Sequence, residues 1–181
     1  TALTQVAADA LEVDPEQITL QIGDTSLPNA TVAGGSTGLA SWGAAVMAAA
    51  QTFRREHGRA PSDGAESTGE AEENPAEEEL AMHSYGAHFA QVSVQETTGE
   101  IRVDRMLGMF SAGRIINPRT ARSQFLGGMT MGVGMALHEK GELDPRFGHV
   151  VNHDLAEYHV PVNADIRSLE VHWLDEEDPQ A

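Results

Sequence analysis

The sequence predicts an α+β fold of two mixed lobes, in which helices pack on antiparallel or mixed sheets. Two long stretches repeat apolar residues every three or four positions, as amphipathic helices do, and several shorter ones alternate apolar with polar residues, as half-buried strands do. Residues 61–80 contain eight acidic residues and no Lys or Arg. We therefore predict a lobe over 1–60, a solvated acidic linker over 61–80 and a second lobe over 81–181.

The first lobe is expected to contain a helix, a strand and a second helix. Residues 1–12 place their apolar side chains on one helical face, and Pro15 follows the end of that helix. Residues 18–24 then alternate as a strand does. The second helix is expected to run to about Arg55 and to end at Gly58, because glycine readily adopts the left-handed conformation that terminates helices.

A glycine-rich turn joins the strand to the second helix. It contains the five candidate binding residues of this lobe, which are Gly34, Gly35, Ser36, Thr37 and Gly38. A helix start gathers unpaired N–H groups and favours an anionic or strongly hydrogen-bonding ligand, with the Ser36 hydroxyl as the expected helix cap. The spacing matches neither the dinucleotide fingerprint nor a P-loop. A capped junction without ligand is the alternative.

In the second lobe, residues 85–95 and 101–110 are predicted to form an antiparallel hairpin around a turn at 96–100. A helix is expected over 119–138, and a last strand over 168–174.

The predicted helix 119–138 is unusually rich in glycine. Each of its glycines costs up to about 1 kcal/mol relative to alanine in a helix interior, so close approach of another backbone or of a bulky ligand is expected. Gln124 precedes Gly127 and Gly128 by one turn and would present a carboxamide beside that surface. The alternative is that the glycines, with Gly132 and Gly134, serve packing between helices and that Gln124 is merely exposed.

Composition excludes several classes of function. The formal net charge is −17, and 12 of the 28 acidic residues lie in 61–80 and 175–178. This balance argues against nucleic acid or an anionic membrane as a partner. The chain has no cysteine, which excludes disulfides, thiolate-bound zinc and iron–sulfur ligation by its own residues. No stretch of 18 uninterrupted apolar residues is present, so no spanning helix is expected.

The residues alone identify no catalytic group and no metal site. Eight histidines are present, several of them between His149 and His159, but their spacing does not match a known ligand motif, and we interpret them as surface or hydrogen-bonded side chains. No Gly-x-Ser-x-Gly elbow occurs. Glu157, between Ala156 and Tyr158, comes nearest to a carboxylate in an apolar setting.

Six blocks of the sequence, taken in order, resemble the molybdenum-binding subunit of the xanthine dehydrogenase and aldehyde oxidase family. They are Leu27-Pro28-Asn29, Gly34 to Gly38, Met82 to Phe89, Gly113 to Pro118, Ala121 to Gln124 with Gly127-Gly128 and Gly132 to Gly134, and Asp154 to Pro161. Together they cover nearly the whole chain outside the acidic segment. The resemblance implies a fold of the molybdopterin-binding-domain type found in molybdenum hydroxylases.

The resemblance also implies a function. Enzymes of that family hydroxylate aldehydes or N-heterocycles with oxygen derived from water, using a molybdopterin cofactor that in bacteria is often a cytosine dinucleotide. Electrons leave through iron–sulfur and FAD subunits or domains, consistent with a chain without cysteine. By resemblance, residues 34–38 lie along the pterin and Gln124 hydrogen-bonds near the metal centre. A cytoplasmic location is expected, with the periplasm and a homo-oligomer left open.

The sequence departs from the family pattern at both ends. The family's catalytic glutamate, in a Gly-Val-Gly-Glu block expected downstream of a segment like 171–178, is missing, and so are earlier cofactor-binding segments. We therefore expect a truncated C-terminal piece that is inactive alone, holds no cofactor tightly and contributes no catalytic residue or metal ligand. The alternative is a non-catalytic α+β binding or assembly module without pterin.

Overall fold

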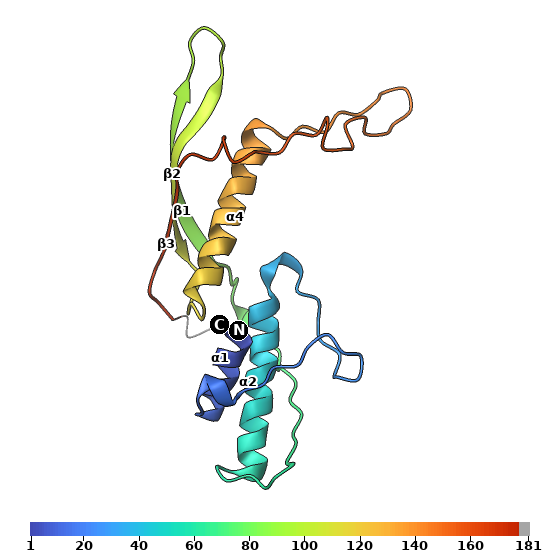
Figure 1. Cartoon of the computed structure of the whole chain (residues 1–181), viewed down its shortest axis with the longest axis vertical. Coiled ribbons are helices and arrows are strands. Elements are labelled where there is room, and N and C mark those ends of the chain that lie inside the picture. Colours follow the sequence, from blue (N-terminus) through green and yellow to red (C-terminus); the bar gives the residue numbers. More distant parts are fainter. Residues whose placement is uncertain (178–181) are drawn as a thin grey trace. The chain divides into compact units, whose positions relative to one another are not determined.

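The computed structural model describes residues 1–177, so Asp178, the last member of the acidic run 175–178, lies outside it. The chain divides into two compact units, Thr1–Leu80 and Ala81–Ala181. The first unit holds three α-helices, α1 (Ala2–Leu11), α2 (Gly38–His57) and α3 (Ala76–Glu79). The second holds β1 (Tyr85–Val94), β2 (Ile101–Ser111), α4 (Pro118–Leu137) and β3 (Leu169–Trp173), whose labels appear in Figure 1. Among residues 1–177, no helix combines the length and the apolar composition needed to cross a bilayer.

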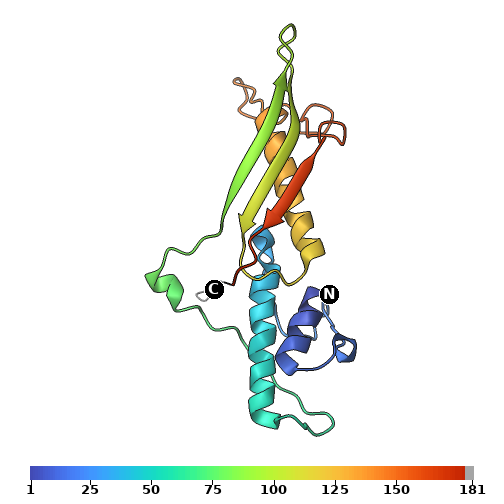
Figure 2. The ribbon, with the colours of Figure 1, turned by 90° about the vertical axis from the view of Figure 1, so that its left-hand side faces the viewer.

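The first unit is built on two packed helices, α1 (Ala2–Leu11) and α2 (Gly38–His57), which lie side by side in Figures 1 and 2. The Thr1 hydroxyl caps α1 by accepting a hydrogen bond from the amide of Thr4 at 3.2 Å. Val6, Ala8 and Ala50 form the small buried core. Gly58, with φ of 68°, ends α2 as the sequence predicted.

The strand predicted over 18–24 is wrong. The chain makes a 3₁₀ turn at Pro15–Gln17 and then runs through 18–24 without strand pairing, and Ile22 is 70% exposed. The physical reason is that a strand needs a neighbour for its N–H and C=O groups. The first unit offers no second strand to pair with among its described residues.

The acidic segment 61–80 belongs to the first unit and runs back along α2. Alternate residues from Ala65 to Ala71 are half-buried. The backbone approaches α2 so closely at Gly69 that an added Cβ would collide with the backbone nitrogen of Ala49. The Ser67 hydroxyl donates to a Glu56 carboxylate oxygen at 2.6 Å. The short helix α3 (Ala76–Glu79) follows.

The second unit contains a mixed three-stranded sheet in the order β1-β2-β3. The strands β1 (Tyr85–Val94) and β2 (Ile101–Ser111) form the predicted antiparallel hairpin, with a register shift between Gln91 and Val92. The last strand, β3 (Leu169–Trp173), lies where it was predicted and pairs with β2 in parallel. The α+β class with a mixed sheet is therefore confirmed.

The helix α4 (Pro118–Leu137) packs on one face of this sheet, behind the strands in Figure 2. The Asn117 side chain caps it by accepting hydrogen bonds from the amides of Arg119 and Thr120. The aromatic rings of Phe110 and Phe125 stack with centroids 4.2 Å apart. This contact and the buried Met129 and Val133 fix which face of α4 is turned toward the sheet.

Candidate cofactor site

The glycine-rich turn has an uncommon backbone conformation. Gly34–Ser36 form one 3₁₀ turn, in which both Gly35 and Ser36 have φ of 64°. Glycine adopts this left-handed region freely, whereas a serine held there costs of order 1 kcal/mol or more. Residues held in this way occur preferentially at ligand-binding sites.

The start of α2 differs from the prediction by one residue. Thr37, not Ser36, occupies the N-cap position, and its hydroxyl donates to the carbonyl oxygen of Gly34 at 2.9 Å instead of capping the helix. The expected capping role of Ser36 is therefore wrong, because its left-handed backbone places it within the preceding turn. The first amides of α2 have no acceptor within the helix itself and are suited to an external acceptor.

The loop before the turn is fixed against α2. The indole Nε1 of Trp42 donates to the carbonyl oxygen of Thr31 at 2.9 Å. A Cβ at Gly38 would lie 2.9 Å from the Cβ of Ala33, so only glycine fits there. The turn itself, from Gly34 to Thr37, stays exposed. Trp42 was not among the site residues predicted from the sequence, although an aromatic residue one turn after a helix start is a recognisable signal for such a clamp.

At the beginning of this loop, hydrogen bonds from the amide and the hydroxyl of Ser26 lower the pKa of the exposed Asp24 carboxyl. Both bonds end on the same carboxylate oxygen, at 2.9 and 2.8 Å. They form a closed local turn, so this carboxylate shapes the loop.

The second predicted contact, Gln124, is an exposed residue of α4. Phe125, Met129 and Val133 face the sheet, so Gln124 lies on the outward side of the helix. Gly127 and Gly128 share this exposed side, and a Cβ at either would meet nothing within 4 Å.

The exposed side of α4 continues beyond the two glycines. Gly132 is equally open, and Met131 and Met135 are 66% and 71% exposed. Packing within this unit therefore does not explain the glycines at 127, 128 and 132. Gly134 is different, because a Cβ there would lie 2.7 Å from the Pro161 ring. Met131 and Met135 were not among the predicted site residues, although helical periodicity from Gln124 places them on the same face.

The candidate residues fit a large, polar, anionic group. The turn in the first unit offers exposed backbone donors, and the open face of α4 offers a carboxamide beside backbone that no side chain covers. The turn belongs to the first unit and the open face of α4 to the second. The convergence of residue 36 and Gln124 on one ligand stays a prediction.

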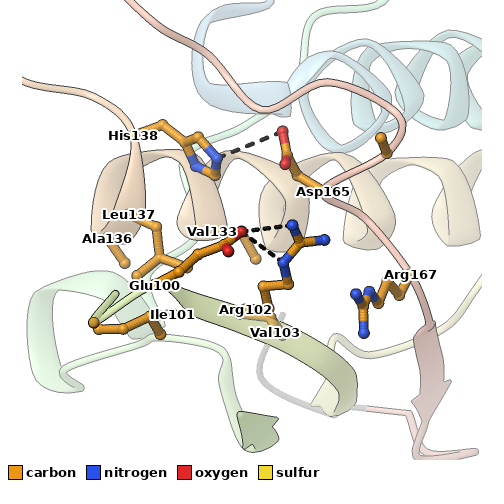
Figure 3. A pocket seen from close by; sticks show the side chains of 12 residues that line it. Glu100, Ile101, Arg102, Val103, Val133, Ala136, Leu137, His138, Asp165 and Arg167 are labelled. Atoms are coloured by element: carbon orange, nitrogen blue, oxygen red, sulfur yellow. Dashed lines mark hydrogen bonds and ion pairs between the residues drawn. The ribbon is translucent and has the colours of Figure 1, made fainter. Parts of the chain in front are cut away.

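A cavity of about 480 Å³ lies elsewhere in the second unit, between the start of β2 and the C-terminal end of α4 (Figure 3). Two ion pairs lie at the cavity and its rim, Arg102 with Glu100 at 2.5 Å and Arg167 with Asp104 at 2.5 Å, and a ring nitrogen of His138 lies 3.5 Å from an Asp165 carboxylate oxygen. Because both guanidinium groups are already paired with carboxylates, the cavity is a poor match for an anionic cofactor. It is lined by the last turn of α4, whereas Gln124 lies in the first half of that helix.

Comparison with known proteins provides independent information. The family described as molybdopterin cofactor-binding domain matches residues 1–73 and 60–167. The aldehyde oxidoreductase molybdenum-binding subunit PaoC of Escherichia coli is 39% identical over 207 aligned residues, covering 99% of this chain. The putative xanthine dehydrogenase molybdenum-binding subunit XdhA of Escherichia coli is 33% identical over 98 residues and 54% of this chain. The chain spans 28% of the length of PaoC, and its aligned part spans 13% of the length of XdhA.

Solved structures share the fold. A Cu,Mo-CO dehydrogenase matches with a TM-score of 0.81 at 18% identity, over 99% of this chain and 28% of that chain. The aldehyde oxidoreductase of Desulfovibrio desulfuricans matches with a TM-score of 0.73 at 21% identity, over 99% of this chain and 22% of its own.

Proposed function

This chain belongs to the molybdopterin cofactor-binding domain family, and from that membership we propose that it forms part of the cofactor-binding wall of a molybdenum hydroxylase. The proposed enzyme oxidises an aldehyde or an N-heterocycle, with oxygen taken from water. The observation that carries the proposal is the 39% identity to an aldehyde oxidoreductase molybdenum-binding subunit over 99% of the chain.

Within that enzyme, the residues of this chain bind and orient the cofactor. A bound molybdopterin supplies a redox-active metal centre for oxidation of the substrate carbon. The amides that begin α2, together with the Ser36 hydroxyl, donate hydrogen bonds to its polar oxygens. The Gln124 carboxamide both donates and accepts, and therefore fixes the orientation of a polar edge beside the bare backbone at Gly127 and Gly128.

The proposal extends to the surroundings of this chain. In this proposal, electrons released by substrate oxidation pass to iron–sulfur and FAD subunits or domains. The 181 residues contain no cysteine and so supply no thiolate ligand for an iron–sulfur cluster. We place the enzyme in the cytoplasm. The nucleotide form of the cofactor in this proposal is the cytosine dinucleotide.

The test is the cofactor content of the complete subunit carrying Gln124→Ala or Ser36→Ala. Molybdenum is measured by mass spectrometry, and pterin by its fluorescence after oxidative release. Losing hydrogen bonds worth about 1–3 kcal/mol predicts roughly 5- to 150-fold weaker cofactor binding. Gln51→Ala, at an exposed glutamine of α2, is the matched control and should leave the content unchanged.

Two results would count against the proposal. Unchanged metal and pterin content in both variants would remove the site assignment. A complete subunit that contains neither molybdenum nor pterin would favour the non-catalytic module instead.

A further inference from the structure

Between α4 and β3 the chain forms a long excursion that has no helix or extended strand of its own. Residues 139–162 leave the end of α4, run outward and return, with one isolated β-bridge between Leu143 and Val150. Figure 1 shows this segment, which we call the arm, in orange to brown, reaching away from the sheet and α4 of its own unit.

Hydrogen bonds hold the two sides of the arm together from base to tip. At the base, the Tyr158 hydroxyl donates to the Glu139 carboxylate at 2.7 Å. Farther out, the Asn152 side chain spans the arm, accepting from the Glu142 amide at 2.8 Å and donating to the Lys140 carbonyl at 2.5 Å. The arm therefore has a fixed internal structure despite lacking regular elements.

The tip of the arm is ordered in the same way. The amide of Gly148 donates to the carbonyl of Asp144 at 2.8 Å, and the amide of Asp144 to the carbonyl of His149 at 2.9 Å. The Arg146 guanidinium donates to both carboxylate oxygens of Asp144, at 3.2 and 2.9 Å, and lies 5.3 Å from the centre of the Phe147 ring. Phe147 therefore lies in a turn whose backbone is held by hydrogen bonds on both sides of it.

The arm reverses the usual distribution of polar and apolar side chains. The two buried polar residues found among residues 1–177, Asp144 at 9% and Asn152 at 7% exposed, both lie in it and act as its internal braces. Most of its apolar side chains are exposed, apart from residues such as Pro161 at the base. The most exposed are Leu155 at 81%, Phe147 at 73%, Leu143 at 63% and Val162 at 60%. Ordered apolar residues displayed in this way mark a surface that another body covers.

We propose that the arm docks into the part of the longer molybdenum-binding subunit that lies outside these 181 residues, with Phe147 as its anchor. This inference rests on the proposed function. The family match over 60–167 includes the whole arm, so the arm belongs to the shared family architecture. The relative PaoC is aligned over 99% of this chain but only 28% of its own length, so most of such a subunit is available to receive the arm.

The chemistry of the tip indicates the kind of pocket that receives it. Asp144 already neutralises Arg146, so the tip carries no unpaired charge to seek an acidic surface. Phe147 offers a large flat apolar surface with little side-chain entropy to lose, as anchors at interfaces do. The receiving pocket is therefore apolar.

Trypsin cleavage after Arg146 tests this in the complete subunit. The Arg146 side chain is 77% exposed here, so the bond would be open to the protease if the arm were undocked. The cleavage rate of each subunit is divided by the rate for a synthetic peptide with that subunit's own arm sequence, which removes the effect of residue 147 on the protease itself. We expect this normalised rate at the bond after Arg146 to be at least tenfold lower in the unchanged subunit than in Phe147→Ser. Phe147→Leu, which keeps an apolar anchor, should remain protected.

A second variant separates docking from internal order. Asn152→Ala removes the brace and should speed cleavage, whereas Phe147→Ser keeps the hydrogen bonds of the arm and removes, besides the anchor, only the ring contacts with Arg146 and His149. Equal normalised rates in the unchanged subunit and Phe147→Ser would overturn the proposal, and so would protection that appears only at high protein concentration, which would mean a second copy. Molybdenum and pterin content is measured on the same samples and tests the proposed function. The cleavage rates test the docking of the arm, so either proposal can fail without the other.

Discussion

At the scale of single residues, two glycines of the candidate site are explained by different physics. Gly35 has φ of 64° and open space where a Cβ would lie, so its role is conformational. Gly127 has ordinary helical geometry and equally open space, so nothing within its own unit requires glycine there. The same substitution at these positions should therefore change stability in opposite directions.

We predict that Gly35→Ala destabilises the chain by about 1–2 kcal/mol, because alanine pays for left-handed geometry. Gly127→Ala should stabilise it by about 0.5–1 kcal/mol through helix propensity. Urea unfolding measures both, with Trp42 fluorescence reporting on the first unit and Trp173 on the second in single-tryptophan backgrounds. A loss of stability in Gly127→Ala would contradict the prediction, because it would mean that another part of the chain packs against α4 at Gly127.

The carboxyl of Asp144 provides a prediction about pH. Hydrogen bonds from the side chain and then the amide of Arg146 lower its pKa. A lowered folded-state pKa means that the stabilisation is complete above the ordinary aspartate value of about 3.9 and is lost as the pH falls through the lowered value. We expect the amide signals of Arg146 and Gly148 in NMR spectra to shift together in that range, whereas Asp144→Asn should abolish the transition.

At the scale of elements, one face of α4 is buried against the sheet and the opposite face is exposed. Met129 is 4% exposed against the sheet, and Met131, two positions later, is 66% exposed. We predict that Met129→Ala lowers the free energy of unfolding by about 2–5 kcal/mol, because it leaves a cavity. Met131→Ala, the matched control, should change it by no more than about 0.5 kcal/mol. Similar losses in the two variants would mean that the faces of α4 are assigned incorrectly.

Local signals account for the elements that the sequence predicted well. The Asn117-Pro118 start of α4, the Gly58 end of α2 and the alternating hairpin strands each depend on residues close together in the chain. The strand expected over 18–24 failed because its alternation was present but its partner was not. The contact of Gly69 with α2 could not be predicted, because it joins backbone to backbone across 20 residues and leaves no periodic pattern.

In the candidate site, too, features set by nearby residues could be predicted, whereas features set by packing could not. A helix start and a glycine-rich helix face were recognisable from residue types, whereas the left-handed Ser36 and the capping position of Thr37 were not. These depend on how the turn is held by Trp42 and by the contact between Gly38 and Ala33. Residue types therefore indicate where a ligand could bind, and the donor geometry follows only from packing.

At the scale of the whole molecule, charge is the dominant long-range feature. The formal net charge is −17, and eight of the acidic residues lie in 61–80, whose first part runs along α2. Like charges held close together destabilise a compact state, and salt screens them with a Debye length of about 10 Å at 0.1 M. Exposed ion pairs such as Arg59 with Glu12 are also weakened by salt, but such pairs contribute only about 0–1 kcal/mol each.

Repulsion should therefore outweigh the lost ion pairs, and we predict that raising NaCl from low to moderate concentration increases the melting temperature of the chain. Replacing Glu70, Glu72 and Glu73 by glutamine should raise the melting temperature at low salt, because it removes three mutually repelling negative charges. The melting temperature should then depend less on NaCl, since less repulsion remains for salt to screen. Arg59→Gln is the matched control and should steepen the dependence by adding to the negative excess. A melting temperature that falls with NaCl would mean that ion pairs, not repulsion between acidic residues, dominate the electrostatics of this fold.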